Sequence, residues 1–101
     1  MTGTEAKYLL EAVIEKTEKS IEKEKGYQRE LTDDRSTLVQ IQNLQDNGEV
    51  LPDGCGYDSY TEWKEQIEKE IKTGESSIRR IEVEKAELMA FKFFVETAPE
   101  V

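Results

Sequence analysis

The chain has 101 residues, enough for one domain, and its 14 Lys and Arg against 23 Asp and Glu give a net charge of −9. Only 36% of the residues are hydrophobic, which excludes a broad globular core and favours a thin, highly charged helical assembly. The negative charge argues against direct binding of nucleic acid or of anionic membranes. No apolar run is long enough for a signal peptide or a membrane-spanning helix, so we expect a cytoplasmic protein.

A first helix is expected over residues 4–46. Thr2 and Glu5 form a capping-box pattern at its start, and Asn47-Gly48 supplies the left-handed residue that commonly ends a helix. An alternative stays open in which the chain breaks between Gly26 and Asp34 and a separate helix begins there, which would give three helices.

The connecting segment, residues 46–58, is expected to form an acidic tip loop, because its glycines and proline do not suit a helix. It holds four acidic and no basic side chains, and it exceeds the two to eight residues common between helices in bundles. One interpretation is recognition of a partner, and the other is a structured cap over the hairpin end. The candidate partner-binding residues are Asp46, Glu49, Asp53, Cys55, Tyr57 and Asp58.

A second helix is expected over residues 59–97, beginning at the Ser59 and Glu62 capping box and ending at Ala98-Pro99. Apolar residues of the two helices pair at positions whose numbers have a nearly constant sum, as an antiparallel hairpin requires. We therefore predict an all-α single domain over residues 1–101, a coiled-coil-like antiparallel two-helix hairpin. The predicted pairs are Leu10 with Phe94, Ile14 with Phe91, Tyr27 with Ile78, Leu38 with Ile67, Ile41 with Trp63, and Leu44 with Tyr60.

The middle of the hairpin has few apolar residues, and each helix carries a glycine there, Gly26 and Gly74. Glycine inside a helix costs up to about 1 kcal/mol relative to alanine. The prediction is that Tyr27 lies over the notch that Gly74 leaves, and a hinge at this point is the alternative.

The end that holds both termini carries more apolar residues than one seam between two helices can bury. Assembly of a homo-oligomer into a four-helix or larger bundle would cover the surplus, and an aromatic patch for a foreign protein is the alternative. The candidate oligomer-interface residues are Leu9, Leu10, Val13, Ile14, Leu88, Met89, Phe91, Phe93, Phe94 and Val95.

Catalytic chemistry has little support in this sequence. There is no histidine to act as a base for a serine or cysteine nucleophile, and Cys55 has no cationic neighbour in the tip to activate it. The tip also departs from the EF-hand calcium pattern, and the ligands of a zinc site are missing. We therefore expect no catalytic residues, no metal site and no cofactor.

The remaining class is binding. We expect a non-enzymatic, acidic, oligomeric hairpin that acts on an unidentified protein partner, as a small inhibitor or adaptor of the virus-encoded type. A second hypothesis is an oligomer that sequesters an anionic small molecule or nucleotide between protomers, with Lys23, Lys25, Tyr27 and Arg29 as the candidate pocket.

A third hypothesis is a nucleic-acid mimic or an acidic-tipped probe of RNA polymerase. In architecture alone the hairpin resembles bacterial transcript-cleavage factors, which insert a two-helix coiled coil with acidic residues at its end into a polymerase channel. The resemblance implies that the carboxylates of Asp46, Glu49, Asp53 or Asp58 would hold a metal ion against the polymerase.

Overall fold

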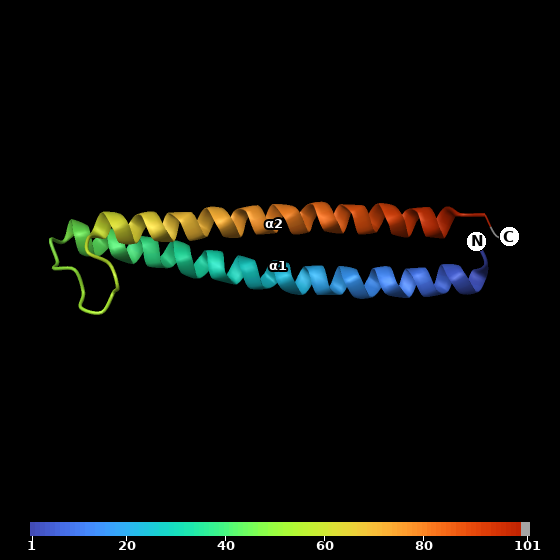
Figure 1. Cartoon of the computed structure of the whole chain (residues 1–101), viewed down its shortest axis with the longest axis horizontal. Helices are drawn as coiled ribbons and strands as arrows, with labels where there is room; N and C mark the ends of the chain where they lie inside the picture. The colour runs from blue at the N-terminus through green and yellow to red at the C-terminus, as the bar shows by residue number, and fades with distance from the viewer. Residues whose placement is uncertain (100–101) are drawn as a thin grey trace. The chain divides into compact units, whose positions relative to one another are not determined.

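The computed structural model describes residues 1–99, and all regular secondary structure in that range is helical (Figure 1). Helix α1 covers Gly3–Asp46, helix α2 covers Tyr60–Thr97, and residues 47–59 connect them. The predicted bounds are confirmed to within one residue at each end.

Helix α1 is continuous, so the alternative with a break between Gly26 and Asp34 is wrong. The Thr32 hydroxyl, which would have capped a new helix, donates a hydrogen bond of 3.0 Å to the Gln28 carbonyl one turn earlier. That bond is typical of a threonine inside a helix. A single glycine costs too little to interrupt a helix of 44 residues.

Both ends of α1 are capped by local hydrogen bonds. At the start, the Thr2 hydroxyl accepts from the Glu5 amide at 3.1 Å, and the Glu5 carboxylate accepts from the Thr2 amide at 3.4 Å. At the end, Gly48 has a φ of 70°, and its amide donates to the Gln45 carbonyl at 3.1 Å. The following amide donates back to the Leu44 carbonyl at 3.0 Å, which completes a Schellman motif.

The start of helix α2 is also capped by local hydrogen bonds. The Ser59 hydroxyl accepts a hydrogen bond of 3.1 Å from the Glu62 amide, as the capping box predicts. The Glu62 carboxylate accepts from the Asp58 amide, at 3.3 Å, one residue before the cap.

The chain folds as two compact units, and each helix contributes a segment to both. Unit 1 consists of Met1–Gly26 and the residues from Ile78 onward, and unit 2 is Tyr27–Ser77. Within unit 1 the segments run antiparallel: the Met1 ammonium donates to the Pro99 carbonyl at 2.8 Å, and the Ser20 hydroxyl donates to the Glu84 carboxylate at 3.1 Å.

The core of unit 1 contains Val13, Ile81 and Val95, each at most 5% exposed. The predicted seam pairs Ile14 with Phe91 and Leu10 with Phe94 are wrong, because Ile14 is 47% and Phe94 60% exposed. The reason is helical phase. Val13 and Ser20 of α1 are both buried and lie one heptad apart on the side that faces the seam, so Ile14, the residue after Val13, points about 100° away from it.

Unit 2 also pairs antiparallel segments, here close to the connecting loop. Ile41 and Ile67 are buried, and Leu44 and Tyr60 are half-buried, as the pairing rule predicts for this part of the chain. Lys64 donates to the Gln45 side chain at 2.7 Å across the two helices.

The notch at Gly74 is filled by Leu31, which is 4% exposed, and the prediction that Tyr27 fills it is wrong. Residues 31 and 74 obey the constant sum, whereas Tyr27 lies one turn earlier on α1. Tyr27 instead lines the groove beside this contact.

Candidate functional site

Residues of the tip make defined contacts with the start of α2. The ring of Tyr57 stacks on Trp63, with centroids 6.2 Å apart and planes at 14°, and the Tyr60 hydroxyl donates to the Glu49 carbonyl at 2.9 Å. Gly54 and Gly56 have φ values of 80° and 84°, a backbone region that suits glycine. These contacts support the interpretation of the tip as an ordered cap, with Tyr57 used for internal packing.

The four acidic side chains of the tip, Asp46, Glu49, Asp53 and Asp58, are all exposed. Their exposure keeps them available to a cationic partner. Asp46 accepts a hydrogen bond of 2.8 Å from the Gln42 side chain.

Metal binding at the tip has no geometric support. Among residues 1–99, no group of three or more His, Cys, Asp or Glu side chains is placed to hold a metal ion. Cys55 is half-buried, and its thiol lies 3.4 Å from the Tyr57 carbonyl as a weak donor.

Neither α1 nor α2 combines the length and apolarity needed to cross a membrane.

The candidate interface residues at the terminal end divide into two groups. Val13 and Val95 are buried inside unit 1, and Leu9, Leu10 and Leu88 are half-buried. The other five face solvent: Ile14 is 47%, Met89 72%, Phe91 42%, Phe93 67% and Phe94 60% exposed. Tyr8 and Ile21, which sequence reasoning did not include, are also exposed and lie in the same unit.

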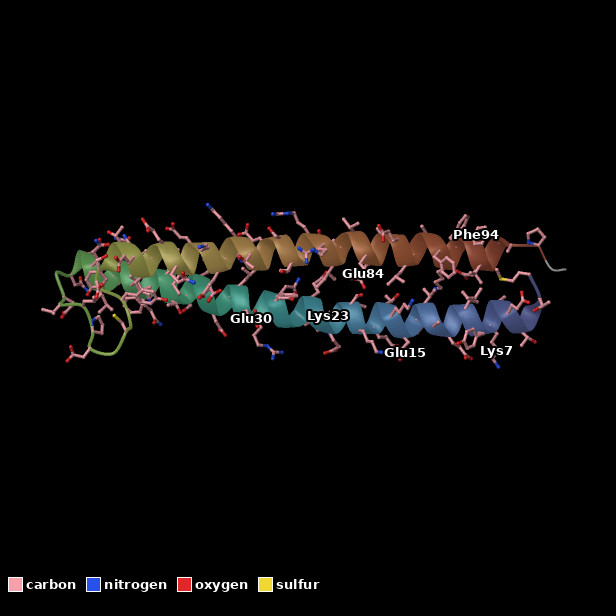
Figure 2. The ribbon with its side chains drawn as sticks, viewed as in Figure 1. Lys7, Glu15, Lys23, Glu30, Glu84 and Phe94 are labelled. Atoms are coloured by element: carbon pink, nitrogen blue, oxygen red, sulfur yellow. The ribbon has the colours of Figure 1, made fainter. Side chains whose placement is uncertain are left out.

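The exposed apolar residues lie on two different sides of unit 1. Met89 and Phe94 are about 140° apart around α2, so they point to opposite sides of the seam. On the Phe94 side its ring stacks with Phe91, at a centroid distance of 6.5 Å (Phe94 is labelled in Figure 2). On the Met89 side a groove of about 390 Å³ runs between the helices, lined by Val13, Ile14, Thr17, Glu18, Ile21, Lys85, Leu88, Met89 and Lys92.

The seam of unit 1 is partly polar. Ser20 is 2% exposed and donates to Glu84, and Lys85 Nζ lies 2.9 Å from Glu24 Oε2 and donates to Oε1 at 3.1 Å. The Glu24 side chain is only 16% exposed, so the Lys85 charge compensates a largely buried carboxylate. Sequence reasoning missed these residues because it assigned seam positions by apolarity, whereas Ser20 lies one heptad after Val13 and Glu24 one heptad before Leu31, at seam positions of α1.

Unit 2 contains an acidic groove of about 490 Å³ beside Leu31 and Gly74, and Tyr27, Glu30, Asp34 and Glu70 are among its lining residues. Burial raises the pKa of Asp34 above its ordinary value of 3.8, and repulsion from Glu70 raises it further. A hydrogen bond between the two side chains favours the protonated form in the same direction. Asp34 and Glu70 therefore form a carboxyl pair across the two helices.

The structure describes the surroundings of three of the candidate anion-binding residues within single units. Lys23, on α1, lines a groove of about 460 Å³ in unit 1, whose other wall carries Glu84 (both labelled in Figure 2). Lys25 lies 4.0 Å from the Glu22 carboxylate. Tyr27 lines the acidic groove of unit 2, whose charge opposes an anionic ligand.

Comparison with known proteins finds no matching family model, no matching curated protein and no matching solved structure. Inference about function therefore depends on this chain's own residues. They offer an exposed apolar surface on unit 1 and an ordered acidic tip in unit 2.

Proposed function

We propose that this chain is a non-enzymatic binding protein that acts through protein–protein contacts, as a small inhibitor or adaptor. The observation that carries the proposal is the exposure of large apolar side chains in unit 1, where the stacked rings of Phe91 and Phe94 are 42% and 60% exposed. Exposed apolar patches of this kind are typical of interaction surfaces.

The distribution of these side chains supports a specific surface. Helix α2 between Leu88 and Val95 has only one charged residue, Lys92, and its apolar side chains point in every direction around the helix. A helix that is hydrophobic on all sides is normally covered. In unit 2 the exposed large hydrophobic residues are Val39 and Val50, one on α1 and one in the loop, which do not form such a cluster.

The acidic tip gives the proposed binding protein a second contact. Its four exposed carboxylates favour a partner with a cationic surface, and the internal stacking of Tyr57 on Trp63 reduces the ordering cost on binding. An inhibitor that covers a cationic groove on its target would use this end, with the aromatic pair Phe91 and Phe94 making the apolar contact.

A capture experiment tests the proposal with two variants and a matched control. The full chain is immobilised and exposed to an extract of its source cells, beside a variant with Phe91→Glu and Phe94→Glu. The control is Val83→Glu, since Val83 is 59% exposed on the same helix and outside the aromatic pair. We expect a protein that is captured by the wild type and the control and lost with the double variant. Identical capture by all three chains would reject the proposal.

A tip variant separates the two contacts. Asp46→Asn, Glu49→Gln, Asp53→Asn and Asp58→Asn remove the tip charges without changing side-chain size. We expect weaker capture at low salt and little difference at high salt, because screening weakens exposed charge pairs. Full capture at low salt would show that the tip does not contact the partner.

A further inference from the structure

We infer that the groove on the Met89 side of unit 1 binds the same groove of a second copy of this chain, forming a symmetric four-helix dimer. The inference goes beyond the proposed function, because it names a second copy of this chain as a partner. The groove lies between α1 and α2 and has a volume of about 390 Å³.

The groove walls are mainly apolar and incompletely covered. Ile14 and Ile21 of α1 lie one heptad apart on one wall, 47% and 36% exposed, and Met89 of α2 lies on the other wall, 72% exposed. The seam below them carries polar Thr17, and no segment among residues 1–99 covers the apolar stripe beside it, as the exposure of Ile14, Ile21 and Met89 shows. A second copy supplies an identical stripe at the same spacing.

The exposed area matches what a dimer needs. Together with neighbouring Phe93, these side chains expose on the order of 400 Å² of apolar surface, taking about 200 Å² for a fully exposed side chain. A stable interface of standard size buries about 800 Å² from each partner, and about 56–65% of that area is apolar. One copy therefore covers this side of unit 1, and no larger partner is required.

The charges around the groove are self-complementary. Its charged lining residues are Glu18 on α1 and Lys85 and Lys92 on α2. A two-fold axis that places α1 of one copy over α2 of the other brings each Glu18 towards Lys92 of the second copy. Stacking α1 on α1 would bring the two Glu18 carboxylates together, so the charges select the first arrangement. Lys85 is already paired with Glu24, which leaves Lys92 as the expected partner of Glu18.

Light scattering coupled to size-exclusion chromatography of the full chain tests the dimer. At micromolar concentrations we expect a mass of twice the 11.7 kDa of one chain. Met89→Glu places a carboxylate in the apolar groove and should weaken dimerisation by about tenfold or more, while Val83→Glu, on the same helix outside the groove, should not. Circular dichroism checks that both variants remain helical. A wild-type monomer, or a dimer unaffected by Met89→Glu, would overturn the inference.

A charge reversal tests the arrangement of the two copies. Glu18→Lys should weaken dimerisation several-fold, and adding Lys92→Glu should restore it, because the pair is rebuilt with opposite signs. Failure of the double variant to recover would reject the placement of α1 over α2. The outcome is independent of the proposed capture of a foreign protein, which was assigned to Phe91 and Phe94 on the opposite side of α2. A monomer that still captures its partner would reject only the dimer.

Discussion

Leu31 Cδ2 lies 2.9 Å from the position that a β-carbon on Gly74 would occupy. Leu31 is 4% exposed, and this buried contact sets the distance between α1 and α2 at the end of unit 2 that is far from the connecting loop. Helices approach this closely where one of them has no side chain, and the apolar partner then fills the space.

The two helical glycines should respond differently to alanine. Gly26→Ala adds a methyl group that would meet nothing within 4 Å beyond its chain neighbours and its own helix backbone, so we expect a gain of about 1 kcal/mol in unfolding free energy from helix propensity. Gly74→Ala must displace Leu31, and the strain of about 1–3 kcal/mol should cancel or exceed the same gain. Urea denaturation followed by circular dichroism measures both.

A double variant checks the cause of that difference. In a Leu31→Ala background the obstacle at Gly74 is removed, so Gly74→Ala should then stabilise the chain by about as much as Gly26→Ala does. If Gly74→Ala is equally favourable with Leu31 present, the close contact does not constrain the helices.

The carboxyl pair Asp34 and Glu70 should make stability depend on pH. The folded pKa of Asp34 is raised above 3.8, so the native chain holds this proton more tightly than the unfolded chain does. The resulting stabilisation is complete below about pH 3.8 and is lost as the pH rises through the folded pKa. Asp34→Asn should therefore be more stable than wild type at neutral pH and lose this part of the pH dependence.

Urea midpoints measured at a series of pH values test the carboxyl pair. Asp33→Asn is the matched control. Asp33 is exposed, and its repulsion makes the smallest contribution to the raised pKa of Asp34. Equal shifts of the midpoint in the two variants at neutral pH would show that general charge reduction is responsible, and that the pair across the helices is not.

The ion pair between Lys85 and Glu24 should contribute far more to the free energy of unfolding than an exposed ion pair does. Lys85→Met leaves a carboxylate that is only 16% exposed without its cation, and we expect a loss of about 1–3 kcal/mol in unfolding free energy. Lys25→Met removes the pair with Glu22, whose side chains are 63% and 78% exposed, and should change stability by less than about 1 kcal/mol. Thermal or urea unfolding distinguishes these values, and equal effects would contradict the burial argument.

The hydrogen bond from Tyr60 to Glu49 should hold the tip in place. Tyr60→Phe removes the bond of 2.9 Å while keeping the ring, and a loss of about 1 kcal/mol or less is expected. Hydrogen exchange should show faster exchange of tip amides, with the rest of the chain little affected. Tyr8→Phe, at a tyrosine that is 71% exposed, is the control and should leave the tip amides unchanged.

Local chemistry in the sequence was sufficient to place the secondary structure. Capping at Thr2 and Ser59 and termination at Gly48 depend on residues within one turn of each other, and all three appear as predicted. The ion pair between Glu15 and Lys19 is local in the same sense, because the two residues lie one turn apart on α1 with their charged atoms 3.1 Å apart. Glu75 of α2 lies 3.5 Å from Arg35 of α1, a pair that residue spacing along one helix does not predict. Contacts between the two helices cannot be predicted from residue spacing within one helix.

The sequence by itself determined two helices, their bounds, the capped ends and the antiparallel register, because these follow from residue spacing and from hydrogen bonds between near neighbours. The tertiary structure decided which side of each helix is buried. Apolarity alone favoured Ile14 and Phe94 for the seam, yet adjacent residues of a helix point about 100° apart, and in unit 1 the buried residues are Val13, Ser20 and Val95 instead. The apolar side chains left outside by this choice form the surfaces to which we assign binding.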